Sequence, residues 1–257
     1  MVAENNITKY TEKETMPSPK ISVVIPAYNE EKYLTVALDS FKNQTFKDFE
    51  LIIADGGSTD RTEKITQKYN AKFITVKNSN VVRARDAGLK AARGEILVGA
   101  DADTFYPPNH LATIFKKYES DGEIVALTGA AKMVNGPWWG VLIWDWTYKI
   151  IALFYRLTGK VLYAPAYNLS YRREKLLELG GYDTELDFGG DELDVTRRLK
   201  RVGKIAFSEN LCPRTDGRRY KVGFFTFLFK HALFYYSLNY FLARYFHKSL
   251  IKAKPVR

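Results

Sequence analysis

The chain has 257 residues, 46% hydrophobic and 26% charged, which is ordinary for a folded protein and leaves room for one large α/β domain or two small ones. Its single cysteine, Cys212, excludes an internal disulfide and fits a reducing compartment. The net charge of +10 is unevenly spread: residues 197–257 contain fifteen Lys and Arg against two acids and so carry +13, whereas the rest of the chain carries −3. We therefore expect an anionic ligand or surface near the C-terminal end.

The chain begins with a polar arm and continues as an alternation of strand and helix patterns. Residues 1–19 contain no apolar core segment, which excludes a secretory signal and predicts a flexible arm. From residue 21 onward, short β-branched runs predict strands and amphipathic runs predict helices. The expected strands are 21–27, 50–57, 72–76 and 95–100, and the expected helices are 29–44, 58–69 and 81–92. Such alternation is typical of parallel βαβ units, whose ligands bind beyond the carboxyl ends of the strands.

Three polar clusters follow the expected strands. They are YNEE at 28–31, DGGSTD at 55–60 and DADT at 101–104. Because the carboxyl ends of parallel strands share one edge of a sheet, the three clusters should converge on a single crevice. Ser58 or Asp60 is the expected cap of the helix that follows the second cluster.

The second half of the chain has a looser pattern. A helix at 109–120 and a strand at 123–130 precede an aromatic stretch at 137–160, which fits either an amphipathic surface helix or a core or lid helix. No internal repeat or low-complexity linker divides the chain. The expected organisation is an arm at 1–19, a catalytic α/β domain at 20–215 and a basic aromatic segment at 216–257.

Asp101 and Asp103 are candidate metal ligands. In a strand, residues two apart point the same way, so the two carboxylates could share one cation, and oxygen ligands suit Mg²⁺ or Mn²⁺. A solvated turn or a helix cap would also place acids here. Asp55, directly after the run LIIA and before two glycines, adds a third carboxylate at the same edge, although an ordinary strand-to-helix turn explains the glycines.

Several motifs in order resemble the family-2 glycosyltransferases. These are ISVVIPAYNEEKYL, LIIADGGSTDRT, ARDAGLKAARGEILVGADADT and YNLSYRREKLLELGGYDTEL, followed by DELDVTRRL. The resemblance covers roughly residues 20–207. It implies the GT-A fold, a nucleotide-binding α/β sandwich with a mostly parallel central sheet, and inverting sugar transfer.

The resemblance assigns roles to individual residues. Asp55 matches the aspartate that bonds the base, and Asp103 is implied to be the direct metal ligand, with Asp101 contributing to ribose or metal. Arg85 matches the family's nucleotide-contacting arginine, with Arg83 as a nearby alternative, although Asp86 stands where the family has Asn. The full set implied to bind the nucleotide sugar is Pro26, Tyr28, Glu30, Asp55, Arg85, Asp101, Ala102, Arg218 and Arg219.

The catalytic candidates are the adjacent acids Asp191 and Glu192. The family pattern has Glu-Asp where this chain has the reverse order. Alignment on Asp194 and Arg198 puts the base at Glu192, and a shift of one residue puts it at Asp191. Acids in the first turn of a helix also stabilise its dipole, which is the structural alternative.

The C-terminal segment predicts a membrane contact. Residues 222–246 are rich in Phe and Tyr but are interrupted by charges, which favours an interfacial helix or hairpin over a transmembrane span or a packed face. Arg218 and Arg219 fit either a mobile loop over the diphosphate or a basic membrane-facing patch.

The expected function is metal-dependent, inverting transfer from a UDP- or GDP-linked sugar to a lipid-phosphate or lipid-linked glycan acceptor, with Mn²⁺ or Mg²⁺ as cofactor. We expect it at the cytoplasmic face of a membrane, peripheral or interfacially anchored, in the synthesis of cell-surface glycans or glycoproteins. Two alternatives are a nucleic-acid-binding protein that uses its basic tail and a non-catalytic sugar-nucleotide-binding subunit. The apolar character of the tail argues against nucleic acid, and the sequence defines no oligomeric state.

Overall fold

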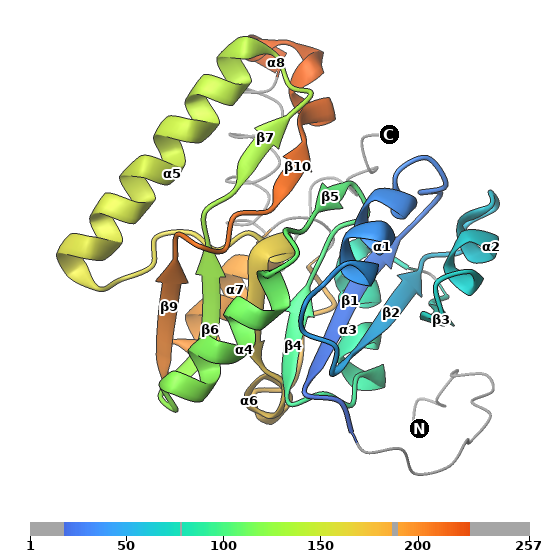
Figure 1. Cartoon of the computed structure of the whole chain (residues 1–257), viewed down its shortest axis with the longest axis horizontal. Helices are drawn as coiled ribbons and strands as arrows, with labels where there is room; N and C mark the ends of the chain where they lie inside the picture. Colours follow the sequence, from blue (N-terminus) through green and yellow to red (C-terminus); the bar gives the residue numbers. More distant parts are fainter. Residues whose placement is uncertain (1–17, 78, 187–189, 227–257) are drawn as a thin grey trace.

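Seven strands form the central sheet of the computed structural model, which describes residues 18–77, 79–186 and 190–226 (Figure 1). Their order across the sheet is β3-β2-β1-β4-β8-β6-β9. The strands are β1 (Ile21–Ala27), β2 (Phe49–Asp55), β3 (Lys72–Thr75), β4 (Ile96–Gly99), β6 (Ile124–Gly129), β8 (Leu169–Arg172) and β9 (Lys204–Ser208). Only β8 is antiparallel to its neighbours β4 and β6, so the predicted mostly parallel α/β sheet is confirmed.

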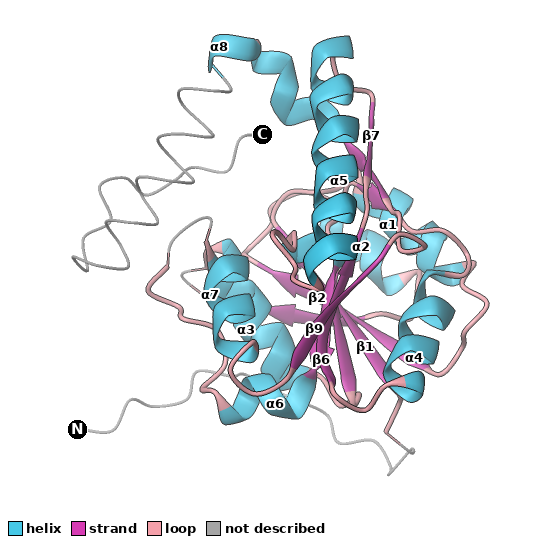
Figure 2. Cartoon of the chain, turned by 90° about the vertical axis from the view of Figure 1, so that its left-hand side faces the viewer, coloured by secondary structure: helices cyan, strands magenta, loops and turns pink. Residues whose placement is uncertain are grey.

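Helices cover both faces of this sheet (Figure 2). On one face, α1 (Leu34–Lys42) and α4 (His110–Ser120) pack on Ile21, Val23 and Ile25 of β1, whose side chains alternate between the two faces. On the other face, Val24 lies against α3 (Val81–Ala91), in a cluster shared with α6 (Arg173–Glu178) and α7 (Asp191–Leu199). Burial on both faces explains why the strand sequences are almost continuously apolar.

A glycine brings α3 close to the sheet. A Cβ atom on Gly88 would lie 2.2 Å from Cγ1 of Val24, which is itself buried. Only glycine leaves room for this approach. The close packing of α3 on β1 therefore determines the position of Arg85, which lies one turn earlier in the helix.

A second, smaller sheet completes the fold. It joins β5 (Thr104–Phe105), β10 (Arg214–Asp216) and β7 (Lys132–Val134) in that order. The long helix α5 (Trp138–Thr158) follows β7, and the short helices are α2 (Thr62–Gln67), η1 (Ala166–Asn168), η2 (Gly217–Val222) and α8 (Phe224–Thr226). Pairing of β10 with β5 places η2 beside the turn that carries Asp101 and Asp103.

Two predicted helices begin later than expected. α1 starts at Leu34 because the amides of Tyr33 and Leu34 both bond the Glu30 carbonyl in a preceding turn. α2 starts at Thr62, whose amide donates to the Asp60 carboxylate, while Ser58, the other expected cap, bonds Asp55 instead.

The two ends of the chain bear on the predicted domain limits. Residues 1–17 of the expected arm and 227–257 of the expected membrane segment lie outside the described residues. The predicted boundary at 215 falls within β10, which ends at Asp216. Within residues 18–77, 79–186 and 190–226, no helix is long and apolar enough to cross a membrane.

Candidate active site

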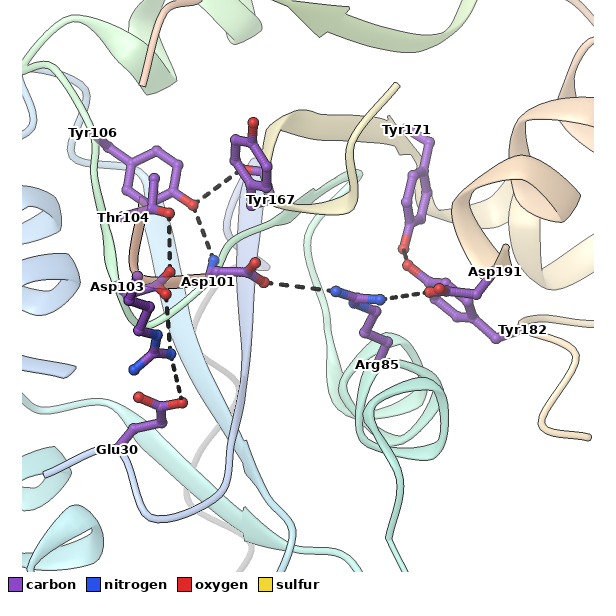
Figure 3. A network of polar contacts seen from close by, with 11 residues as sticks. Glu30, Arg85, Asp101, Asp103, Thr104, Tyr106, Tyr167, Tyr171, Tyr182 and Asp191 are labelled. Atoms are coloured by element: carbon purple, nitrogen blue, oxygen red, sulfur yellow. Dashed lines mark hydrogen bonds and ion pairs between the residues drawn. The ribbon is translucent and has the colours of Figure 1, made fainter. Parts of the chain in front are cut away.

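Asp101 and Asp103 lie in the turn between β4 and β5, and their side chains point apart (Figure 3). Asp101 points towards Arg85, and Asp103 forms an ion pair with Arg218. The expectation that strand alternation would direct both carboxylates the same way is wrong, because the strand ends at Gly99, before the first of them. The repulsion between the two acids is offset by a separate arginine on each.

Arg85 connects the turn after β4 to the first turn of α7. Its Nη1 atom lies 2.7 Å from Oδ2 of Asp191, and Nη2 lies 3.6 Å from Oδ1 of Asp101. The side chains of Arg85 and Asp191 are 13% and 1% exposed. Burial lowers the pKa of the Arg85 guanidinium, but Asp191 and Asp101 outweigh it, so its pKa is raised and the group is always charged.

Asp191 and Glu192 are both buried, yet their carboxyl groups titrate in opposite directions. Burial raises the pKa of Asp191, but the Arg85 charge together with hydrogen bonds from Glu192 and Arg85 holds this pKa below its ordinary value. Burial, followed by the neighbouring Asp191 charge, raises the pKa of Glu192 to about 8. Oδ1 of Asp191 is buried without a hydrogen-bond partner, and a proton on Glu192 can serve it. The pair therefore consists of a fixed carboxylate and a carboxyl group that can gain or lose a proton near neutral pH.

Arg218 links two of the predicted polar clusters. Its Nη2 atom lies 3.0 Å from Oδ2 of Asp103 and 3.3 Å from Oε1 of Glu30, and its guanidinium stacks 4.2 Å from the ring centroid of Tyr33. Asp216 holds the segment by accepting a hydrogen bond from the Arg218 amide. Burial, and then the Asp101 charge, raises the pKa of Asp103 to about 6 despite the arginine. Glu30 and Asp103 thus meet at Arg218, as the expected convergence of their clusters predicts.

Asp55 shapes its own loop. Its carboxylate is buried and accepts hydrogen bonds from the amides of Gly57 and Ser58, each at 2.8 Å, and from the Ser58 hydroxyl. This arrangement matches the turn alternative. Its bonding to a base stays a prediction.

The other implied residues surround this centre in different ways. Pro26 lies in β1, in register with Ala54 of β2, and Tyr28 is exposed just beyond the strand. Ala102 is buried in the core, and its binding to a ligand stays a prediction. Arg83 is exposed on α3, whereas Arg85 reaches the acids, which favours Arg85 of the two. Arg219 is half-buried in η2 beside Arg218.

Buried tyrosines that the sequence analysis missed position the acids. The Tyr106 hydroxyl accepts from the Asp101 amide and donates to the Tyr167 carbonyl, both at 3.0 Å, and so holds the turn (Figure 3). The Tyr182 hydroxyl bonds that of Tyr171 at 2.7 Å. The Tyr182 amide donates to Asp86, which gives a structural role to the acid that departs from the family pattern. Tyr106 lies in the motif DADTFYPP, a few residues after the two acids, and this proximity could have indicated that it supports their turn.

The carboxylate oxygens of Asp101 and Asp103 suit Mg²⁺ or Mn²⁺, but they would supply only part of the coordination shell of the cation. Among the described residues, no group of three or more His, Cys, Asp and Glu side chains is placed to hold a metal ion. One carboxylate oxygen of Glu30 is buried without a hydrogen-bond partner, which leaves an additional acceptor beside Arg218. Because Mg²⁺ commonly uses one or two carboxylates and completes its shell with water and substrate phosphates, this set is compatible with a cation that arrives with a diphosphate.

Comparisons with known proteins agree with this architecture. The model of glycosyl transferase family 2 matches residues 22–180, more than half of the chain. The chain therefore belongs to glycosyl transferase family 2 and is a glycosyltransferase by family, as its motifs predict.

Two curated relatives illustrate the similarity. The poly(ribitol-phosphate) beta-N-acetylglucosaminyltransferase TarS of Staphylococcus aureus is 32% identical over 199 residues, which are 73% of this chain and 34% of the relative. The putative glycosyltransferase EpsH of Bacillus subtilis is 30% identical over 122 residues, 46% of this chain and 36% of the relative. This chain thus spans about a third of the length of each.

Solved structures share the fold. S. aureus TarS 1-349 in complex with UDP superimposes with a TM-score of 0.63 at 23% identity, covering 77% of this chain and 60% of that one. The mannosyltransferase PcManGT of Pyrobaculum calidifontis, in complex with GDP-Man and Mn2+, has a TM-score of 0.56 at 22% identity, covering 77% and 56%. These likenesses establish the GT-A fold for the described α/β domain.

Removal of the Arg85 charge should destabilise the protein strongly. Arg85→Met leaves the Asp191 carboxylate buried without its cation, which should lower the free energy of unfolding by about 3–5 kcal/mol in a urea titration. Adding Asp191→Asn should recover more than half of that loss, because the buried charge is then absent as well. Lys175→Met, which breaks an exposed ion pair with Glu178, is the control and should have no measurable effect. An Arg85→Met protein as stable as the wild type would contradict the assigned role.

The stability of the wild type relative to Glu192→Gln should depend on pH. The folded protein keeps the Glu192 proton up to about pH 8, whereas the unfolded chain loses it near the ordinary value of 4.5. Unfolding therefore releases a proton between these limits, and the wild type should lose up to roughly 3 kcal/mol relative to the variant between about pH 5 and pH 8. Urea unfolding of both proteins across this range tests the sign. A constant difference between them would show that Glu192 titrates normally.

Proposed function

We propose that this chain catalyses the inverting transfer of a sugar from a UDP- or GDP-linked donor to a lipid-linked or glycan acceptor. The observation that carries the proposal is that the Asp101–Asp103 turn, the Arg85 charge and Asp191 form one connected polar network (Figure 3), with Glu192 directly after Asp191 in α7. In open α/β folds this edge of the sheet is where ligands bind. The UDP, UDP-GlcNAc and GDP-Man named with the structures of similar fold support a nucleotide sugar as the donor.

Glu192 is the proposed general base. A base works best when its pKa lies near the working pH, and the pKa of Glu192, raised to about 8, meets this condition. Asp191 is less suited, because its pair with Arg85 keeps it ionised and weakly basic. The ionised form of Glu192 would take the proton of an acceptor hydroxyl as the hydroxyl oxygen attacks the anomeric carbon and the bond to the diphosphate on the opposite face breaks. Asp191 would act as a positioning residue that fixes Arg85.

The cations of the site suit a departing diphosphate. Arg218 and Arg219 lie on η2 beside Asp103, where guanidinium groups can form paired hydrogen bonds with phosphate oxygens. Asp103, with Asp101, would hold a divalent cation, which when bound neutralises charge that develops on the leaving group. Glu30 would orient Arg218, with which it already pairs.

A membrane surface at the cytoplasmic face is the proposed location, and a lipid-phosphate or lipid-linked glycan the proposed acceptor, in cell-surface glycan or glycoprotein synthesis. The excess of positive charge in residues 197–257, together with the aromatic run 222–246, supports an anionic lipid surface at this end of the chain. A phosphate acceptor would already be ionised and would need less help from a base. A hydroxyl acceptor would depend on Glu192.

Donor binding should raise the melting temperature only when the acidic turn is intact. UDP- or GDP-sugars with Mn²⁺, at about a hundred times the dissociation constant, should stabilise the protein by about 2.7 kcal/mol, or roughly 5–10 °C. Asp103→Asn should abolish the gain, whereas Asp121→Asn, at a half-buried acid elsewhere, should leave it intact. Absence of any shift in folded wild-type protein would refute the donor assignment.

The same samples separate binding from transfer. Glu192→Gln should retain the donor-induced shift but lose about 10²–10⁴-fold in transfer or donor hydrolysis. A wild-type protein that binds the donor and neither transfers nor hydrolyses it would instead identify a non-catalytic sugar-nucleotide-binding subunit.

A further inference from the structure

Helix α5 has two opposite apolar faces, and only one of them is buried. Its inner face packs Tyr148, Ile151 and Ala152 against Ala131 and Phe207. The outer apolar residues are all exposed, from 44% for Ile143 to 79% for Trp138. They are Trp138, Leu142, Ile143, Trp146, Ile150, Leu153 and Leu157, which we call the outer stripe. Spacings of four, four, four, three and four residues keep most of them in one line along the helix.

Nothing in the described part of the chain covers the outer stripe. Figure 1 shows α5 at the edge of the molecule beside β7. Figure 2, seen from that side, shows the helix in front of the other described elements. Continuous exposed apolar surface of this kind marks an interaction site.

The charges around the outer stripe suit an anionic lipid surface. Lys149 lies 5.1 Å from the ring centroid of Trp146, and Lys160 is exposed just after the helix ends. Beyond it, a groove of about 210 Å³ combines the apolar side chains of Leu162 and Leu193 with the cations Arg197 and Lys200. Tryptophan and lysine beside aliphatic residues are typical of helices that lie at the headgroup boundary.

The basic end of the chain starts beside α5. The ring of Phe224 contacts that of Trp139 at 5.3 Å, and Phe225 is exposed next to it. Residues 227–257, which follow directly, carry six Lys and Arg and no acid. The last described residues, which lead into this basic sequence, therefore lie at the N-terminal end of α5.

We propose that the outer stripe of α5 is a membrane-docking surface that lies in the headgroup region of a bilayer containing anionic lipids. The helix is not apolar enough to span, since within its 21 residues it contains Asp145, Lys149 and Arg156. It lies in the plane of the membrane, with its inner face still packed on the domain. This inference rests on the membrane location proposed above, but not on the donor chemistry.

Docking through α5 orients the candidate active site. Tyr220, two residues after Arg218, lies against Trp139 and Trp144 of this helix, at 5.9 and 5.8 Å between ring centroids. The segment that carries Arg218 is thus attached to the helix that meets the lipid. An acceptor held by the bilayer would reach the crevice from this side.

Vesicle binding by the full chain tests the proposal. Leu142→Gln, Ile150→Gln and Leu153→Gln together should weaken binding to vesicles of phosphatidylcholine and phosphatidylglycerol at least about tenfold in co-sedimentation. Val36→Gln with Val202→Gln, at exposed apolar positions on α1 and after α7, is the matched control and should bind as the wild type does. The donor-induced thermal shift, measured without vesicles, should be unchanged in both variants.

Two further measurements cover a triple variant that fails to fold. Lys149→Glu with Lys160→Glu should weaken binding to the anionic vesicles. Brominated lipid should quench the tryptophan fluorescence of the wild type more than that of Trp146→Phe.

Unchanged vesicle binding by a folded triple variant would overturn the proposal. Failure of the wild type to bind any vesicle would refute the membrane location itself. A wild-type dimer that the triple variant converts to a monomer, with vesicle binding unchanged, would assign the stripe to a second copy of the chain.

Discussion

The buried guanidinium of Arg85 is the interaction around which the candidate active site is organised. It contacts Asp191, 106 residues away in the sequence, and Asp101, so that α3, α7 and the turn after β4 share one charge. Burying these groups has a large desolvation cost, which only close pairing can offset. The same charge separates two adjacent acids, because it holds Asp191 ionised while burial keeps a proton on Glu192.

A second arginine performs the corresponding task on the other side of the turn. Arg218 pairs with Asp103 and Glu30, and it arrives there because β10 joins a small sheet with β5. That sheet also supports α5 through β7. The position of Arg218, the proposed phosphate-binding side chain, and the position of the proposed membrane-docking helix therefore depend on the same few strand pairings.

Local sequence patterns were sufficient to predict the alternating strands and helices of the central α/β domain. The run ISVVIPA became β1 at the expected residues, since a β-branched apolar segment buried on both faces has few alternatives. β2 ends at Asp55, two residues before the end expected at 57, and Arg85 reaches Asp101 and Asp191 from α3. Helix starts were less predictable. The polar residues before α1 and α2 form hydrogen bonds with one another across the loops. These partners lie about 30 residues apart in the sequence, so a local pattern does not reveal them.

The identity of the acids and of the family followed from short motifs, because strand ends and their polar residues are encoded within a few positions of one another. The residues that pair with these acids could not be predicted from short motifs. Asp101 and Asp103 diverge because the strand stops before them, and each meets an arginine from a distant segment. Tyr106 holds their turn through a carbonyl 61 residues further along the chain. The choice between Asp191 and Glu192 rests on burial beside Arg85, and burial exists only once the helices have packed on the sheet.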